Sequence, residues 1–136
     1  MEDRHGGGCL CGAVRYVAVG SPETVSICHC TSCRRAVGAT PVAWVIFSVE
    51  KFTISGPSFV SYASSANVTR TFCRECGTSL TFKVQDSPDT VDITLASFDQ
   101  PDGFVPERHI WLEDEAIVEK ANLPRYGRDP LGSQET

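Results

Sequence analysis

Apolar and polar positions alternate over several short segments of the chain, and this period of two is the pattern of half-buried β-strands. Apolar residues recur at every second position in 14–19 and in 91–95, where Asp92 and Thr94 take intervening places. A continuous apolar run with β-branched and aromatic residues occupies 42–47, and turn residues bound two further segments, 52–54 and 78–84. All five segments are predicted strands.

The segment 31–37 is the one stretch that predicts a helical turn or two, because it begins with a Thr or Ser cap and ends near Gly38. Turn signals are short and evenly spaced through residue 100, without a repeat or a linker. After Tyr126 the composition shifts to Gly, Asp, Pro, Ser and Gln. We expect a single, mainly β domain over 1–125 and a polar tail over 126–136.

Composition and charge argue against several classes of function. With 136 residues, 41% hydrophobic and 21% charged, the chain has the length and make-up of one globular domain. A net charge of −5 argues against nucleic-acid binding. The longest apolar stretch, 41–47, is far shorter than the roughly 20 residues that cross a bilayer. The amino terminus lacks the apolar run of a signal peptide, so we expect a cytoplasmic, reducing environment and no membrane partner.

Cysteine is the unusual component of this sequence. There are seven, an odd number that internal disulfides cannot pair completely. They form three short motifs: Cys9-x-Cys11, Cys28-x-Cys30-x-x-Cys33 and Cys73-x-x-Cys76. In a reducing compartment, clustered cysteines are more often metal ligands or catalytic groups than structural bridges.

The spacing of these motifs predicts two zinc ions per chain. Closed structural zinc sites take four ligands, commonly from two short pairs distant in sequence, so the two pairs Cys9/Cys11 and Cys73/Cys76 complete one such site. The triplet then provides three ligands and an open position, which is typical of a catalytic zinc. Two alternatives stand beside this interpretation. The pairs could be buried free thiols, and Cys30 with Cys33 could form a redox centre, although that leaves Cys28 unexplained.

The motifs also resemble a known family. The runs GGCLCGAVRY, CHCTSCRRAVGA and FCRECGTSL, followed by VDITLASFD and PERHIW, are similar to the glutathione-dependent formaldehyde-activating enzymes, also called the centromere protein V family, over roughly residues 6 to 112. The resemblance implies a β-tent (Mss-like) fold of coiled antiparallel sheets. It implies a structural zinc at the four paired cysteines and a catalytic zinc at the triplet. It further implies carbon-sulfur lyase chemistry, which interconverts S-(hydroxymethyl)glutathione with glutathione and formaldehyde.

Positive charge near the triplet suits an anionic peptide thiol. Arg34 and Arg35 follow Cys33 directly, and either they contact the substrate or they neutralise thiolate charge. Trp44 lies in the next predicted strand, where an indole edge could line the opening, although such residues more often pack in a core.

The three histidines differ in their expected roles. His29 lies between two proposed ligands, so its side chain should point away from their metal, because neighbouring residues of an extended segment face opposite sides. For His109, in PERHIW, a pocket role and plain packing are both open. His5 belongs to the glycine-rich start of the chain and is expected to be solvated.

Two functions of different classes follow from these features. The first is a zinc-dependent carbon-sulfur lyase with Cys28, Cys30 and Cys33 at the active metal, acting on a glutathione-like thiol and a small aldehyde. The alternative is a non-catalytic, zinc-stabilised interaction or thiol-binding module, in which a fixed protein group would fill the fourth position of the triplet site. A homodimer remains open as the assembly.

Overall fold

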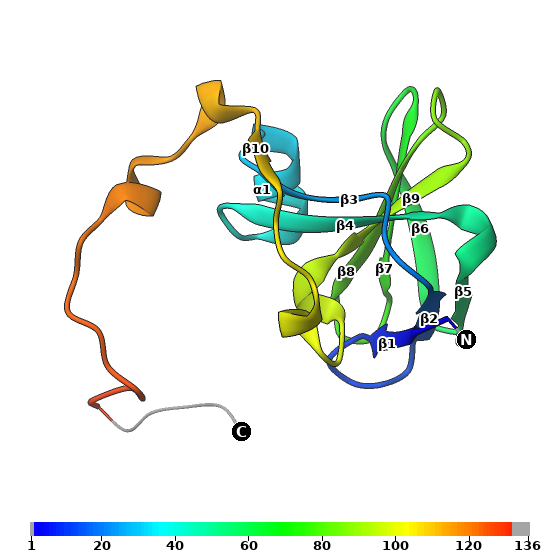
Figure 1. Cartoon of the computed structure of the whole chain (residues 1–136), viewed down its shortest axis with the longest axis horizontal. Coiled ribbons are helices and arrows are strands. Elements are labelled where there is room, and N and C mark those ends of the chain that lie inside the picture. The colour runs from blue at the N-terminus through cyan, green and yellow to red at the C-terminus, as the bar shows by residue number, and fades with distance from the viewer. Residues whose placement is uncertain (1, 132–136) are drawn as a thin grey trace.

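The computed structural model describes residues 2–131, in which ten strands form two sheets and one α-helix packs at the end of the large sheet beside β4 (Figure 1). The strands are β1 (Arg4–Gly8), β2 (Arg15–Val19), β3 (Thr24–Cys28), β4 (Val42–Ser48), β5 (Phe52–Ser55), β6 (Phe59–Ser65), β7 (Val68–Cys73), β8 (Ser79–Val84), β9 (Thr90–Thr94) and β10 (Arg108–Ile110). The helix is α1 (Thr31–Val37). Short 3-10 turns follow β4, β9 and β10.

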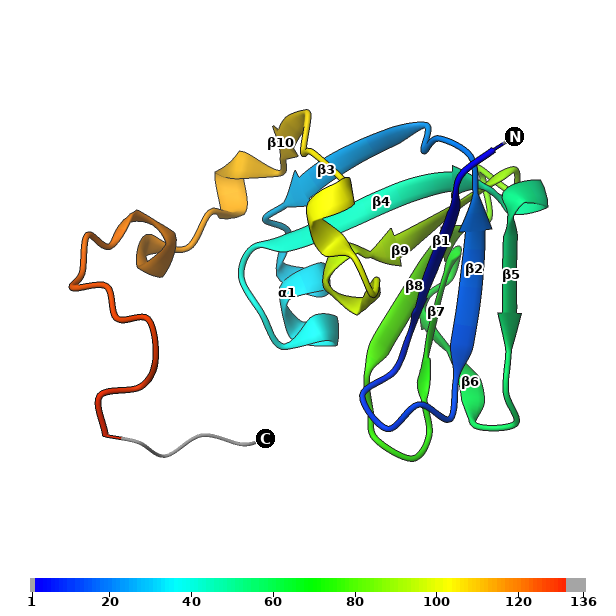
Figure 2. The same cartoon turned by 60° about the horizontal axis from the view of Figure 1, so that its bottom comes forward.

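The two sheets differ in size and lie face to face, as Figure 2 shows from a second side. The small sheet has the order β1-β2-β5, and the large one has the order β10-β3-β4-β9-β8-β7-β6. Every pair is antiparallel except β10 with β3. This architecture is the mainly β arrangement expected from the sequence, and it agrees with the β-tent fold that the resemblance implied.

The larger hydrophobic core lies between the two sheets. Its most deeply buried large side chains include Tyr16, Phe47, Leu80 and Ile93. The apolar run of β4 serves two environments, because side chains alternate across a strand. Val45 and Phe47 enter this core, whereas Trp44 packs in a second cluster with the triplet cysteines on the opposite face of the large sheet.

All five predicted strands and the predicted helix are confirmed, with strand ends displaced by at most one residue. The helix begins at Thr31 and ends before Gly38, whose φ of 76° lies in the left-handed region that favours glycine. Its N-cap is Cys30, whose sulfur accepts a hydrogen bond from the amide of Cys33 at 3.3 Å. A triplet cysteine, rather than a Thr or Ser, therefore caps the helix.

The expectation of a solvated His5 is wrong. The residue lies in β1 and is half-buried, its Nε2 is 3.0 Å from the carbonyl oxygen of Gly20, and its ring packs 4.9 Å from that of Phe104. Gly7 in this strand cannot carry a side chain, because the Tyr16 ring and a backbone oxygen of Ser97 occupy the space beside it.

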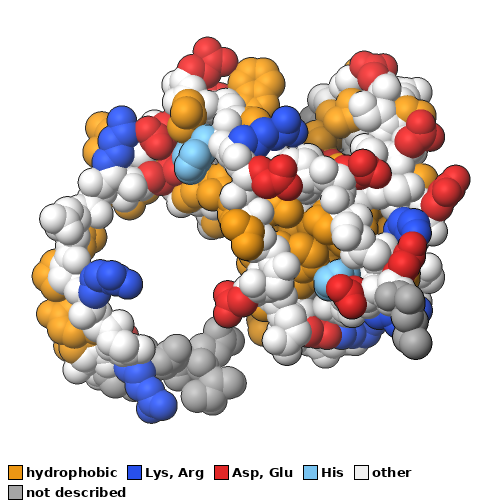
Figure 3. Space-filling model, in the orientation of Figure 1, with side chains coloured by type: hydrophobic (Ala, Val, Ile, Leu, Met, Phe, Trp, Pro, Cys, Tyr) orange, Lys and Arg blue, Asp and Glu red, His pale blue; other side chains and the backbone are white. Residues whose placement is uncertain are grey.

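Beyond β10 the chain leaves the body as an extended arm. Residues 112–131 contain two short 3-10 turns and several exposed apolar side chains, and the space-filling view shows the arm standing off the sheets (Figure 3). The boundary between a domain at 1–125 and a tail at 126–136 stays a prediction, and residues 132–136 lie outside the described part. None of the helices in residues 2–131 has the length and apolar character needed to cross a membrane.

Candidate metal centres

The four paired cysteines meet at one place although they are far apart in sequence. Cys9 and Cys11 lie in the connection from β1 to β2, while Cys73 ends β7 and Cys76 lies in the turn to β8. The Sγ atoms of Cys9 and Cys11 are 3.6 Å apart, and those of Cys11 and Cys73 are 3.8 Å apart. With zinc-sulfur bonds of about 2.3 Å, sulfurs at the corners of a tetrahedron are about 3.8 Å apart, so these thiols fit a zinc ion.

Both connections have the backbone conformation of a tight turn around a metal. Gly12 and Gly77 have φ of 81° and 79°, and the amides of these glycines donate to the carbonyls of Cys9 and Cys73. The amide of Val14 also donates to the Sγ of Cys9 at 3.2 Å. Each cysteine pair is therefore closed by a glycine turn.

The thiols of this cluster differ in how readily they ionise: although a backbone hydrogen bond from Ala13 favours its thiolate, burial and hydrogen bonds shared with the neighbouring thiols raise the pKa of Cys11 to about 12. A hydrogen bond from the Thr78 hydroxyl, supported by backbone amides, lowers the pKa of Cys76 to about 5. A low pKa supplies the anion that zinc requires.

The triplet forms a second cluster at the junction of β3 and α1. Cys28 ends β3, Cys30 caps the helix and Cys33 lies in its first turn, and each can place its sulfur within 4.8 Å of the other two. The hydrogen bond from Cys28 lowers the pKa of Cys33 to about 5, while the same shared proton raises the pKa of Cys28. Arg70 adds to this shift by donating from Nη2 to the Sγ of Cys33 at 3.7 Å.

No fourth histidine, cysteine or carboxylate completes the triplet within the described range 2–131. In place of a further ligand, the triplet borders a cavity of about 390 Å³. The cavity is lined by Cys28, Cys30, Thr31, Ser32, Cys33, Trp44, Arg70, Phe82, Asp92, Ile110, Trp111 and Asp114. An exogenous ligand can therefore approach the three sulfurs from this side.

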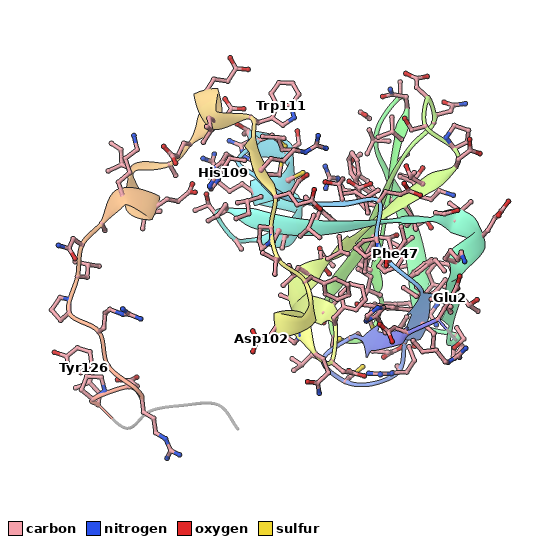
Figure 4. All side chains as sticks on the ribbon, in the orientation of Figure 1. Glu2, Phe47, Asp102, His109, Trp111 and Tyr126 are labelled. Carbon is pink, nitrogen blue, oxygen red and sulfur yellow. The ribbon has the colours of Figure 1, made fainter. Side chains whose placement is uncertain are left out.

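The register of the large sheet assembles the floor of the cavity. Arg70 pairs with Phe82 across β7 and β8, and Phe82 pairs with Asp92 across β8 and β9. The guanidinium carbon of Arg70 lies 4.7 Å from the centre of the Phe82 ring, and the Trp44 ring lies 5.7 Å from that ring. Trp111 follows β10, is 56% exposed and stands at the rim, as Figure 4 shows.

Polar groups without partners concentrate at this floor. Trp44 is 3% exposed and Arg70 9%, yet neither Nε1 of Trp44 nor Nη1 of Arg70 has a hydrogen-bond partner within residues 2–131. Burial raises the pKa of Asp92 to about 7, the charge of Cys33 raises it further, and the charge of Arg108 lowers it. Buried donors without acceptors are costly in a folded protein, which points to a bound group that supplies them.

The structure brings one of the expected substrate contacts, Trp44, to the cavity. Arg34 and Arg35 lie in the last turn of α1, and neither lines it. His109 also lies outside the lining; its Nδ1 is 2.9 Å from Nε2 of His29. As predicted, His29 points away from the triplet, and it is almost fully buried.

His29 ties the arm to the body. Its Nδ1 lies 2.7 Å from a carboxylate oxygen of Glu119, and the other oxygen accepts from the Thr40 hydroxyl at 2.7 Å and the Ala116 amide at 3.0 Å. Burial alone would raise the pKa of Glu119, but these hydrogen bonds hold it below its usual value. His29, Glu115 and Glu119 form a third group of residues whose side chains could hold a metal ion. Both carboxylates already have partners, because Glu119 binds His29 and Glu115 lies 3.3 Å from the ammonium of Lys120.

Sequence reasoning missed Arg70, Phe82 and Asp92. Asp92 was visible only as a polar position of an alternating strand, and Arg70 as a single charge between two threonines. A charged residue flanked by β-branched residues in a strand is a weak signal, because it usually marks the solvent face.

Fold and sites together define a class: a small, mainly β protein with two cysteine clusters that could hold metal ions, one closed and one opening into a cavity. Residues 4–114 match the model of the family described as "Glutathione-dependent formaldehyde-activating enzyme". The chain therefore belongs to this family, as its motifs suggested.

The proteins similar to this chain include a curated relative and a solved structure. A protein of Schizosaccharomyces pombe (strain 972 / ATCC 24843), named an uncharacterized lyase, is 28% identical over 109 residues, which cover 79% of this chain and 78% of that protein. A crystal structure of a Rhodobacter sphaeroides protein has a TM-score of 0.58 at 20% identity, and the match covers 76% of this chain and 98% of that one. The second likeness concerns the fold alone.

Proposed function

We propose that the protein is a zinc-dependent carbon-sulfur lyase of the S-(hydroxymethyl)glutathione synthase type, acting on a glutathione-like thiol and a small aldehyde. The observation that carries the proposal is the open side of the triplet. Three thiols face a cavity of about 390 Å³, and within residues 2–131 no fourth protein ligand closes the site. Family membership and the lyase name of the yeast relative support the reaction class.

The two clusters would hold two zinc ions with different roles. Four thiolates give the closed site a formal charge of 2 − 4 = −2, and it would serve the fold. Three thiolates give the triplet site a formal charge of 2 − 3 = −1 and leave room for a thiol ligand. Zinc at the triplet would lower the pKa of that thiol and hold its sulfur as an aligned nucleophile.

The protein's own residues then position the substrate. Arg70, Trp44 and Phe82 form the floor against which the carbon next to the sulfur would rest, and Trp111 stands at the entrance. Arg34 and Arg35 follow Cys33 on α1 outside the cavity, where we place them as contacts for the distant carboxylates of the peptide thiol. His109 would act through His29, behind the ligand loop.

The alternative function, a non-catalytic interaction module, predicts a fixed fourth ligand. Its best candidates were His29, His109 and a carboxylate. His29 contacts His109 and Glu119, so both histidines are engaged on the side away from the triplet. No carboxylate of residues 2–131 groups with the three sulfurs within 4.8 Å either. The geometry therefore favours an open triplet over a fixed fourth ligand, and the rate measurement below separates the lyase from a thiol-binding module.

Calorimetry and rate measurements on the zinc-loaded protein test this proposal. Glutathione should bind with proton release, S-methylglutathione much more weakly, and Cys30→Ser should remove the proton release. Arg35→Ala should weaken affinity but retain it. Exchange NMR should show that the parent accelerates formation and breakdown of the hydroxymethyl adduct above the uncatalysed background. Equal binding of thiol and methyl ether would exclude sulfur ligation, and ligation without acceleration would leave the thiol-binding module.

A further inference from the structure

Three residues that line the cavity carry hydrogen-bonding groups that nothing in the described chain satisfies. Two are the buried donors Nη1 of Arg70 and Nε1 of Trp44. The third is the carboxylate of Asp92, which accepts no hydrogen bond from residues 2–131; the charge of Arg108 is the one favourable electrostatic contact resolved for it. These groups come from three different strands, β7, β4 and β9, and all line one cavity.

Sheet geometry brings the three groups close together. Trp44 pairs with Thr94, and Asp92 lies two residues before Thr94 on β9, so Trp44 and Asp92 are diagonal neighbours on one face. The Arg70 guanidinium leans over the ring of Phe82, the residue paired with Asp92. Because the other nitrogen of this guanidinium contacts the Sγ of Cys33 at 3.7 Å, its free Nη1 lies beside the triplet.

This set of positions matches one chemical group. A hydroxyl has two lone pairs and one proton, so it is satisfied by two donors and one acceptor. A substrate carboxylate would fit less well, because it would meet the negative charge of Asp92 and of the thiolates across the same floor. A thioether or a plain thiol would leave both donors unpaired.

We propose that Arg70, Trp44 and Asp92 form a binding subsite for the hydroxyl group on the carbon next to the substrate sulfur, with Asp92 as the catalytic acid-base residue. The substrate class is then a hemithioacetal, and the proposal rests on the function proposed above. Arg70 and Trp44 hold the oxygen through its lone pairs, and Asp92 accepts its proton.

The proposed step balances in atoms and charge. In breakdown of R–S–CH₂–OH, Asp92 takes the hydroxyl proton, the oxygen-hydrogen electron pair forms the carbonyl double bond, and the carbon-sulfur pair leaves with the sulfur. The products are the thiolate at the triplet, formaldehyde and protonated Asp92, which returns its proton to solvent. Synthesis is the same step reversed. The hydrogen bonds from Arg70 and Trp44 strengthen as negative charge develops on the substrate oxygen, and this lowers the barrier in both directions.

Isosteric variants of the zinc-loaded full chain test the subsite. Asp92→Asn removes the acid-base group, and Trp44→Phe keeps a ring beside Phe82 but removes the indole N–H. Exchange NMR should show that the enzyme-dependent rate of adduct breakdown falls about 100-fold or more in Asp92→Asn and about 10-fold in Trp44→Phe. Asp102→Asn, an exposed aspartate outside the cavity, is the matched control and should retain the parent rate.

Binding measurements separate this subsite from the sulfur site. Glutathione lacks the hydroxyl, so its affinity by calorimetry should change less than threefold in both variants. In the parent loaded with glutathione, added formaldehyde should move the indole N–H resonance of Trp44 downfield; this resonance is assigned by its absence in Trp44→Phe. Full activity in Asp92→Asn, with the parent active, would overturn the subsite and leave the lyase intact. A parent without acceleration would defeat the proposed lyase, and an unmoved Trp44 resonance would then overturn the subsite as well.

Discussion

Loss of the four-cysteine site should cost far more stability than loss of the triplet site. We expect this because a metal at the four-cysteine site would close a much longer loop of the chain than a metal at the triplet would. The variants Cys76→Ser and Cys30→Ser, which each remove one ligand of one site, test the expectation. The two thiols Cys11 and Cys73 are 62 residues apart in sequence and 3.8 Å apart in space. The outer cysteines of the triplet, Cys28 and Cys33, are five residues apart in sequence.

Loop-closure entropy gives the expected magnitude. We apply to a metal link the relation between loop length and stabilisation that holds for disulfides. It gives about 4 kcal/mol for the 62-residue separation of Cys11 and Cys73 and about 2 kcal/mol for the five-residue separation within the triplet. The total stability of a domain is about 5–15 kcal/mol, so losing the link at the four-cysteine site would remove much of it. For a chain of this size, the difference of about 2 kcal/mol corresponds to a gap of about 6–10 °C between the two melting temperatures.

The assay is thermal unfolding of both zinc-loaded variants, with zinc per chain measured in parallel. Serine keeps the size of cysteine but is a poor zinc ligand, and at position 30 it can still accept the capping hydrogen bond of α1. Cys76→Ser should bind about one zinc and melt well below Cys30→Ser, or fail to fold. A chelator should take the triplet zinc of the parent first. Equal melting temperatures with equal zinc loss would refute the assignment of separate structural and catalytic roles.

Three further substitutions test packing and electrostatics. Because burial raises the pKa of Asp92 to about 7, the folded state binds its proton more tightly than the unfolded state does, so this carboxyl costs stability as pH rises from about 4 to 7. Asp92→Asn should therefore be more stable than the parent at pH 8, by at most about 4 kcal/mol, and equally stable at pH 3. Glu119→Ala removes the partner of His29 and should lower the melting temperature and speed amide exchange in the arm, whereas the exposed Glu113→Ala should change neither. Gly7→Ala should cost more than about 2 kcal/mol, since its Cβ would lie 2.7 Å from a backbone oxygen, whereas Gly103→Ala, with open space around it, should be neutral; equal melting temperatures of the two would contradict the packing described for β1.

The sequence predicts those elements whose own side chains carry the burial signal. The strands β4 and β9 and the helix α1 have the period or the caps of their class. The strand β1 was missed because its glycines have no apolar side chains, and the Tyr16 ring from β2 fills the space beside them. The strand β6 was missed because most of its side chains are exposed, so that no alternation appears.

The sequence predicts the cysteine clusters better than the cavity for a comparable reason. Cysteine clusters depend on short spacings that a sequence displays directly. The cavity floor depends on register across β7, β8, β9 and β4, which aligns Arg70, Phe82 and Asp92 in one row. Pairing between strands is not visible in a single sequence, so a charged residue of an alternating strand was indistinguishable from a solvent-facing one.

The strand β4 contributes side chains both to the core between the sheets and to the cavity. Its alternating residues face the core through Val45 and Phe47 and the cavity through Trp44. A slip of one residue in its pairing with β9 would exchange these faces, moving the indole donor away from Asp92 and placing a polar neighbour in the core. The core between the sheets opposes that slip, and the four-cysteine cluster joins the β1–β2 connection of one sheet to the β7–β8 turn of the other. A cluster remote from the proposed chemistry therefore fixes the ends of β7 and β8, the two strands that carry Arg70 and Phe82 of the cavity floor.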